Sequence, residues 1–334
     1  MNLCTREAVP DDFTAWLQLE TACFGFDGDT PAGGATEWGL LFLTDAALTL
    51  VIEDIDVPTG PRLVGVAGAV FVSDEFVAWF RQGQPPCLNR HAAHPPTECS
   101  PAILNGAGVD RANASSGLNG LVTHWVWDTV HYSPVDSLYI RTLLMDRFLE
   151  LHAGFNVRQI LIETVGTEGY ERCSAVGFDL LNDYSKWFTN HPKPNPEMHP
   201  YVFEAVRERI LGKDGAAICR PFLYTPPRFG FDRDDQALLL HARQGLSDEE
   251  LAEALFISLA AVKKRWTNIY RRVSDIDNKL LPYQTAGVRG TEKRRRLMRY
   301  LRDHPEELRA YAPRPPAAPV WPSRLGARST TTKP

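Results

Sequence analysis

The chain has 334 residues, 44% of them hydrophobic, which is enough for about two domains with buried cores. It contains no apolar run of about 18 residues and no basic-then-apolar start, so we expect neither a membrane span nor a signal peptide. The six cysteines lack the spacing of a disulfide framework, which predicts a reduced cytoplasmic protein. The charge is uneven, because residues 1–227 carry a net −13 and residues 228–334 carry +8.

The first half of the chain alternates strand-like and helix-like segments. Residues 48–55 and 63–72 are β-branched runs joined by a turn with Pro and Gly, which predicts a hairpin. Residues 81–120 are rich in Pro, Gly, Asn, Ala and Ser, which predicts an irregular insertion. For residues 1–190 we therefore predict an α/β (or α+β) fold with a mixed sheet flanked by helices. The other expected elements are a helix from residue 11, strands at 121–128, 160–165 and 178–188, and helices at 135–152 and 168–176.

This order of elements, together with ILIETVGTEGYERCSAVGFDLL at residues 160–181, resembles the GNAT acyltransferases. The resemblance implies acyl transfer from acetyl-CoA, whose diphosphate the family holds on a glycine-rich turn before the long helix. Here the corresponding TVHYSPVDSLYI has no glycine, and Pro134 removes one backbone donor. Cys173 stands where the family has a tyrosine general acid. We therefore predict a catalytically degenerate sensing domain with no catalytic residues and no cofactor.

Two further groups of residues in this half have side chains that could bind a ligand or a metal ion. His124, Trp125 and Trp127 alternate along a predicted strand, and core packing is favoured there over a ligand pocket lined by tryptophan. The second group has the pattern C-x3-H-x2-H-x4-C, which could bind zinc, but its spacing departs from known zinc fingers and we predict no metal site. Its members are Cys87, His91, His94 and Cys99.

Residues 231–273 predict three short helices with sharp joints. Gly245 is suited to ending the first helix. Ser247 and Glu250 form a capping box for the second, and Ser258 caps the third. On the third helix, Val262, Trp266, Ile269, Tyr270 and Val273 would face inward, and Lys263, Lys264, Thr267 and Arg271 outward.

The run QGLSDEELAEALFISLAAVKKRWTNIYRRV resembles the LuxR-type helix-turn-helix of bacterial transcription regulators, although Ala261 and Arg265 replace the usual Thr and His. The resemblance implies that residues 228–276 bind double-stranded DNA, with the cationic end of the chain drawn to phosphate. The DNA-binding residues it implies are Lys263, Lys264 and Thr267 at base edges, Arg265 and Arg271 at phosphates, and Ser247 and Ser258 as caps presenting N–H groups.

The rest of the chain is less specific. Residues 292–303 place six cations around an apolar edge of Leu297, Tyr300 and Leu301. They could clamp DNA or form a dimer arm, or the apolar edge could simply cover the neighbouring helices. The remaining segments are a connector at 191–227, a basic helical extension at 277–311 and a disordered tail at 312–334.

The principal prediction is thus a cytoplasmic, DNA-binding transcription regulator with an acyltransferase-like sensing domain followed by an all-α helix-turn-helix domain. Beyond double-stranded DNA, RNA polymerase, a small-molecule effector and a homodimer partner remain open as partners. The alternative is an active GNAT-type N-acyltransferase that uses acetyl-CoA and docks through its helical tail. Heat from acetyl-CoA binding in calorimetry would favour the enzyme.

Overall fold

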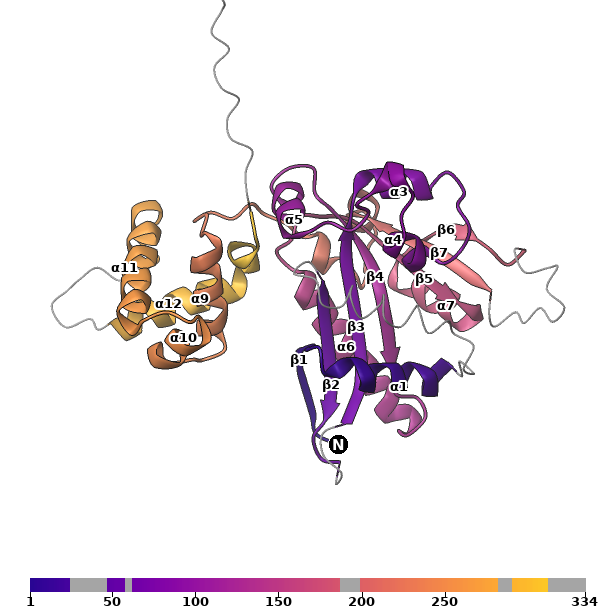
Figure 1. The fold of residues 1–334 in the computed structure, drawn as a ribbon, viewed down its shortest axis with the longest axis horizontal. Helices are drawn as coiled ribbons and strands as arrows, with labels where there is room; N and C mark the ends of the chain where they lie inside the picture. The colour runs from indigo at the N-terminus through magenta and orange to yellow at the C-terminus, as the bar shows by residue number, and fades with distance from the viewer. Residues whose placement is uncertain (25–46, 58–61, 187–198, 282–289, 312–334) are drawn as a thin grey trace, which may run out of the picture.

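The first domain is built on one mixed sheet, as the sequence predicted. The computed structural model describes residues 1–24, 47–57, 62–186, 199–281 and 290–311 (Figure 1). Seven strands follow the order β1-β2-β3-β4-β5-β7-β6, and every neighbouring pair is antiparallel except β4 and β5. The strands are β1 Leu3–Glu7, β2 Leu48–Asp54, β3 Arg62–Val72, β4 Leu118–Trp127, β5 Val157–Val165, β6 Asp179–Asp183 and β7 Pro200–Val206.

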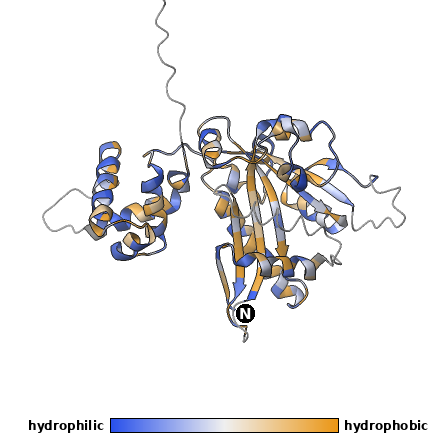
Figure 2. Cartoon of the chain, in the orientation of Figure 1, coloured by the Kyte–Doolittle hydropathy of each residue, from blue (hydrophilic) through white to orange (hydrophobic). Residues whose placement is uncertain are grey.

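Helices cover both faces of this sheet, and Figure 2 shows the hydrophobic residues concentrated along its central strands. Side chains of a strand alternate between faces, so on β4 Trp127 joins the larger cluster with α6 (Pro134–His152), while Val126 packs with α1 (Asp12–Phe24). The short helices α3 (Asp74–Phe80) and α4 (Leu88–Ala93) pack in a third cluster. In the described part of the chain, no helix is long and apolar enough to cross a membrane.

Helix α6 follows from its sequence. Ser133 caps it by accepting the N–H of Asp136, and Pro134 occupies the first turn, where a missing N–H costs nothing. Its buried stripe of Ile140, Leu144, Phe148 and His152 lies toward the sheet. The predicted helix at 135–152 is therefore confirmed.

The prediction that residues 81–120 form an irregular insertion was wrong. This segment contains α4, a 3-10 turn at Thr97–Cys99 and α5 (Gly106–Asn113), and it ends in the first residues of β4. Leu88 is fully buried, and Asn105 caps α5 by accepting the N–H of Gly108. Its Pro and Gly residues separate short helices rather than prevent them.

The sheet also extends beyond residue 190, where the sequence suggested a connector. Strand β7 lies between β5 and β6, and the predicted strand at 178–188 is shorter, at Asp179–Asp183. After β7 come α8 (Arg207–Leu211) and a 3-10 turn, η3 (Arg220–Phe222). The tail at 312–334 lies outside the described residues.

The C-terminal helices pack around a core of their own. They are α9 (Arg233–Arg243), α10 (Asp248–Ala254), α11 (Leu259–Ile276), α12 (Gly290–Asp303) and the 3-10 turn η4 (Pro305–Leu308). Leu297 and Leu301 of α12 are fully buried in this core, so the apolar edge of the basic helix covers its neighbours. Arg294 pairs with Asp248 at 3.0 Å and lies over the ring of Trp266.

Arg309 joins the helical domain to the end of α6. Its guanidinium donates to the carbonyls of Leu151 and Ala153, at 2.8 and 2.9 Å, and lies over the ring of Phe155. Beside it, Gly154 has φ +84°, and a Cβ built there would lie 2.4 Å from the backbone nitrogen of Glu306. The chain therefore needs glycine at residue 154 for this contact to form.

Replacing Gly154 with alanine should lower the free energy of unfolding by about 2 kcal/mol, because it adds a backbone clash to an unfavourable φ. Gly215→Ala is a matched control, since Gly215 also has a positive φ but nothing within 4 Å of the built Cβ. Chemical denaturation of both variants separates the two costs. Equal losses would show that the contact with Glu306 is unimportant.

Candidate functional site

The two parallel strands in the middle of the sheet part before they end. Pairing between β4 and β5 runs from Leu118–Val157 to Val122–Ile162. Beyond that point β4 continues to Trp127 along β3, and β5 continues to Val165 along β7. We call this divergence the fork (Figure 1), with residues 123–127 and 163–165 as its two edges. It is the candidate functional site.

A β-bulge marks the start of the fork. Gly68 of β3 pairs with His124 and Ala69 with Val122, so Thr123 is an extra residue in β4. The bulge brings the side chains of Thr123 and His124 to the same side, against Gly68, where a built Cβ would lie 3.0 and 3.2 Å from them. Sequence reasoning missed this feature. The available signal was a glycine inside a β-branched strand.

Histidine, carboxylate and amide groups meet at the fork on the face covered by α1 and α4. His124 is buried against Trp16, with ring centroids 4.0 Å apart, and its Nδ1 lies 3.4 Å from Glu20 Oε1. Asn89 of α4 donates to the carbonyl of Thr123 at 2.9 Å. The strand predicted at 121–128 therefore places His124 at a polar position and not in an aromatic core alone.

Glu163 holds the other edge of the fork. Its carboxylate accepts the backbone N–H groups of Cys87, at 2.9 Å, and of Leu88. Burial raises the pKa of Glu163, although these two hydrogen bonds act in the opposite direction. The first turn of α4 thus ties β4, through Asn89, to β5, through Glu163.

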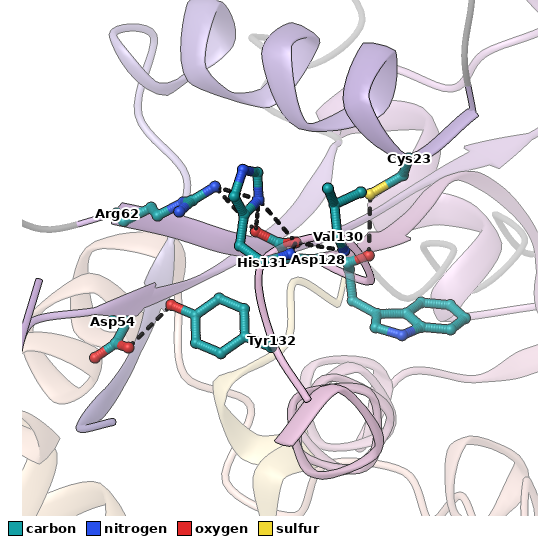
Figure 3. A network of polar contacts seen from close by, with 8 residues as sticks. Cys23, Asp54, Arg62, Asp128, Val130, His131 and Tyr132 are labelled. Atoms are coloured by element: carbon teal, nitrogen blue, oxygen red, sulfur yellow. Dashed lines mark hydrogen bonds and ion pairs between the residues drawn. The ribbon is translucent and has the colours of Figure 1, made fainter. Parts of the chain in front are cut away.

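The loop after β4 is organised around Asp128 (Figure 3). The backbone N–H groups of Val130 and His131 both donate to Asp128 Oδ1 at 2.9 Å. The His131 ring and the Arg62 guanidinium lie 3.0 and 3.2 Å from Oδ2, and the carboxylate is almost fully buried. Tyr132 donates to Asp54 at 2.9 Å, and burial together with this hydrogen bond raises the pKa of Tyr132 to about 12.

The start of α6 does not fit the diphosphate that the GNAT resemblance implies. Pro134 has no N–H, and the N–H of Asp136 is accepted by Ser133. The Asp136 carboxylate in turn accepts the Ser133 hydroxyl at 2.7 Å. The N–H groups of Val130, His131 and Asp136 are therefore already bonded to side chains of the chain itself.

Cys173 does not take the part of an exposed acid. It is buried in α7 (Gly166–Val176), and burial raises the pKa of its thiol to about 11. Near the same helix, Arg172 of α7 and Arg141 of α6 lie over the ring of Trp127, at 5.0 and 5.8 Å from its centroid. Cations from two helices therefore lie beside the last residue of β4.

The four residues considered for zinc make separate contacts. His91 packs edge-on against Trp79, the Cys99 thiol donates to the Glu75 carbonyl, and Cys87 and His94 are the N-cap and C-cap of α4. Among the residues that the structure describes, no group of three or more His, Cys, Asp or Glu side chains could hold a metal ion.

The residues expected to contact DNA lie on α10 and α11. Ser247 and Ser258 cap these helices, and the predicted capping box with Glu250 is present. Arg265 forms an ion pair with Asp234 at 2.7 Å, which makes it part of the helical packing. Lys263, Lys264, Thr267 and Arg271 are exposed, whereas Val262, Trp266, Ile269 and Val273 are buried.

Among known proteins, only solved structures are similar to this chain. No family model matches the chain. No curated protein matches it either. The solved structures that resemble it include the NatC complex bound to Gag peptide and CoA (10% identity, 62% of this chain and 99% of that chain, TM-score 0.35). Two others are FeeM, an N-acyl amino acid synthase from uncultured soil microbes (14%, 62% and 94%, 0.36), and mosquito arylalkylamine N-acetyltransferase like 5b (9%, 61% and 100%, 0.37).

These neighbours correct the principal prediction from the sequence. Two of them are named for acyl transfer, and no comparison supports a LuxR-type helix-turn-helix, so the prediction of a DNA-binding transcription regulator was wrong. Helix caps, an apolar stripe and an outward basic face are needed by any small helical domain, and they do not identify its partner. At these identities and TM-scores, the activity of this chain must rest on its own residues.

Proposed function

We propose that the first domain is an N-acyltransferase that holds its acyl thioester donor in the fork. The observation that carries this proposal is the end of β4–β5 pairing at Val122–Ile162. Beyond it, the edge of β4 that faces β5 is paired with no strand of the described chain; Asn89 donates to the carbonyl of Thr123 and the Cys23 thiol to that of Trp127. An extended arm that contains amides can pair with such an edge as an added strand.

Transfer to an amine needs a base beside the thioester carbonyl. The amine nitrogen attacks this carbon, the C–N bond forms, the C–S bond breaks, and the thiolate leaves. The amine must lose a proton, and the departing sulfur can gain one. We assign the first task to His124, which the bulge places at the fork, because an imidazole is suited to accepting protons near neutral pH.

Glu20 is the positioning residue in this proposal. Its carboxylate oxygen lies 3.4 Å from His124 Nδ1, so it favours a ring with the proton on Nδ1 and stabilises the imidazolium that forms. Glu163, on the opposite edge, is held by two N–H groups, which suits it to shaping the fork.

The helices α9 to α12 take no part in this chemistry. The acyltransferase alternative from the sequence expected docking through the helical tail, and the exposed cations on α11 suit this tail to an acidic partner surface.

The test is an assay of the purified full chain with acyl thioesters and a panel of small amines and peptides. Free thiol should be released only when both donor and acceptor are present, and mass spectrometry should find the acyl group on the acceptor nitrogen. Absence of amine-dependent thiol release across donors and acceptors would refute the proposal.

A further inference from the structure

The loop around Asp128 indicates which class of acyl donor can bind in the fork. We propose that the donor is an acyl thioester on a pantetheine-like arm without a nucleotide diphosphate, and that Asp128 occupies the place of that diphosphate. This inference rests on the proposed function. It concerns the donor class, which the fold alone leaves open.

The first step is the hydrogen bonding of Asp128. Its carboxylate is bonded to two backbone N–H groups and lies within ion-pair distance of His131 and Arg62. The two backbone N–H groups are therefore already bonded to Oδ1, while the Arg62 guanidinium and the His131 ring lie beside Oδ2. The N–H groups of Val130 and His131 lie in the loop between β4 and the start of α6, the region where an anion at the helix N-terminus would lie.

The second step is the cost of displacing Asp128. Its side chain is 1% exposed, so a ligand phosphate that took its donors would leave a buried carboxylate without partners. Asp136 lies in the first turn of α6, and residues 1–227 carry a net −13. A diphosphate brought to this loop would therefore meet the carboxylates of Asp128 and Asp136 and used donors, while the nearby Arg62, Arg141 and Arg172 already contact Asp128 or the Trp127 ring.

The third step is what the fork still offers. The edge of β4 beyond Val122 presents backbone groups to an extended chain, and a pantetheine arm is a neutral chain with two amides. The open edge of β4 in the fork can therefore bind the pantetheine arm, whereas the Asp128 loop disfavours binding of the nucleotide diphosphate. The same arm occurs as a free thioester or attached to a protein through one phosphate.

The experiment compares acetyl-pantetheine with acetyl-CoA as donors for the full chain, and pantetheine with CoA as ligands in calorimetry. We expect CoA to bind no more tightly than pantetheine, and kcat/KM for the two donors to agree within about threefold. A preference for CoA of about 100-fold in either measurement would overturn the inference while leaving acyl transfer intact. If neither donor reacts, the proposed function fails, and the calorimetry still decides whether the loop admits a diphosphate.

Variants of Asp128 give a second measurement. Asp128→Ser removes the charge and releases the two N–H groups, so it should improve CoA binding at least about tenfold while pantetheine binding stays unchanged. Asp146→Asn is the control for loss of one carboxylate, because Asp146 is an exposed residue of α6, outside the Asp128 loop. Asp128→Asn removes the charge but still offers an acceptor to the two N–H groups, so it should give a smaller gain in CoA binding, and it serves if the serine variant does not fold. No gain with either variant would count against the inference.

A third donor substrate distinguishes a free thioester from one attached to a protein. Acetyl-4′-phosphopantetheine carries the single phosphate of a protein-attached arm. A higher kcat/KM than for acetyl-pantetheine would point to an attached arm, and an equal value to a free thioester, and both support a donor without a nucleotide.

Discussion

His124→Ala should lower kcat for acyl transfer by about 100- to 10,000-fold, the range expected when a positioned general base is lost. Thioester binding should change little, because the donor arm is held by the backbone of β4. The bulge at Thr123 would remain, since it depends on the pairing of β3 with β4 and not on the imidazole.

Three measurements make this prediction specific. Glu20→Gln should cost less than His124→Ala and should also shift the pH profile of kcat, because the carboxylate acts through the ring. His241→Ala, on α9 of the helical domain, is the matched histidine control and should retain full turnover. Full turnover by folded His124→Ala would remove His124 from the mechanism.

Glu307→Ala should lower the free energy of unfolding of the helical domain by about 3 kcal/mol, because it leaves buried hydrogen-bond donors without an acceptor. The Glu307 side chain is fully buried, and its oxygens accept the N–H groups of Arg228 and Phe229 at 2.9 and 3.0 Å. The hydroxyl of Tyr300 adds a third hydrogen bond at 3.2 Å. Burial raises the pKa of Glu307, and these partners oppose that effect.

Denaturant unfolding checks the size of this loss. Glu307→Gln keeps an acceptor oxygen and should cost less, and Glu253→Ala, at an exposed residue of α10, should stay within about 0.5 kcal/mol of the parent chain. A loss below about 1 kcal/mol for Glu307→Ala would show that water replaces the carboxylate.

Local signals predicted the helices well and the site poorly. Ser133 and Ser247 cap helices that begin where the sequence placed them, because capping depends on residues three positions apart. The fork depends on register between strands about forty residues apart, and Asp128 meets Arg62 from a distant strand. Periodicity contains no information on such pairings. The absence of glycine before α6 was visible in the sequence, but the carboxylate that takes the place of a ligand was not.

The same distinction explains the wrong assignment of DNA binding. The buried stripe of α11 and its caps were read correctly, since both are consequences of helix geometry. The outward lysines were then assigned a partner from a resemblance that no comparison supports. Solvent-exposed cations show that a face is hydrated and positively charged, and the partner needs separate evidence.

The contacts of Arg309 at the end of α6 have a practical consequence for experiments on fragments of this chain. Helix α6 is about 28 Å long at 1.5 Å per residue, and it links the Asp128 loop at one end to Arg309 at the other. A fragment cut before residue 228 would uncover the ring of Phe155 and leave the carbonyls of Leu151 and Ala153 to solvent. Kinetics on such a fragment would mix truncation damage with chemistry, so the undivided polypeptide is the proper reagent.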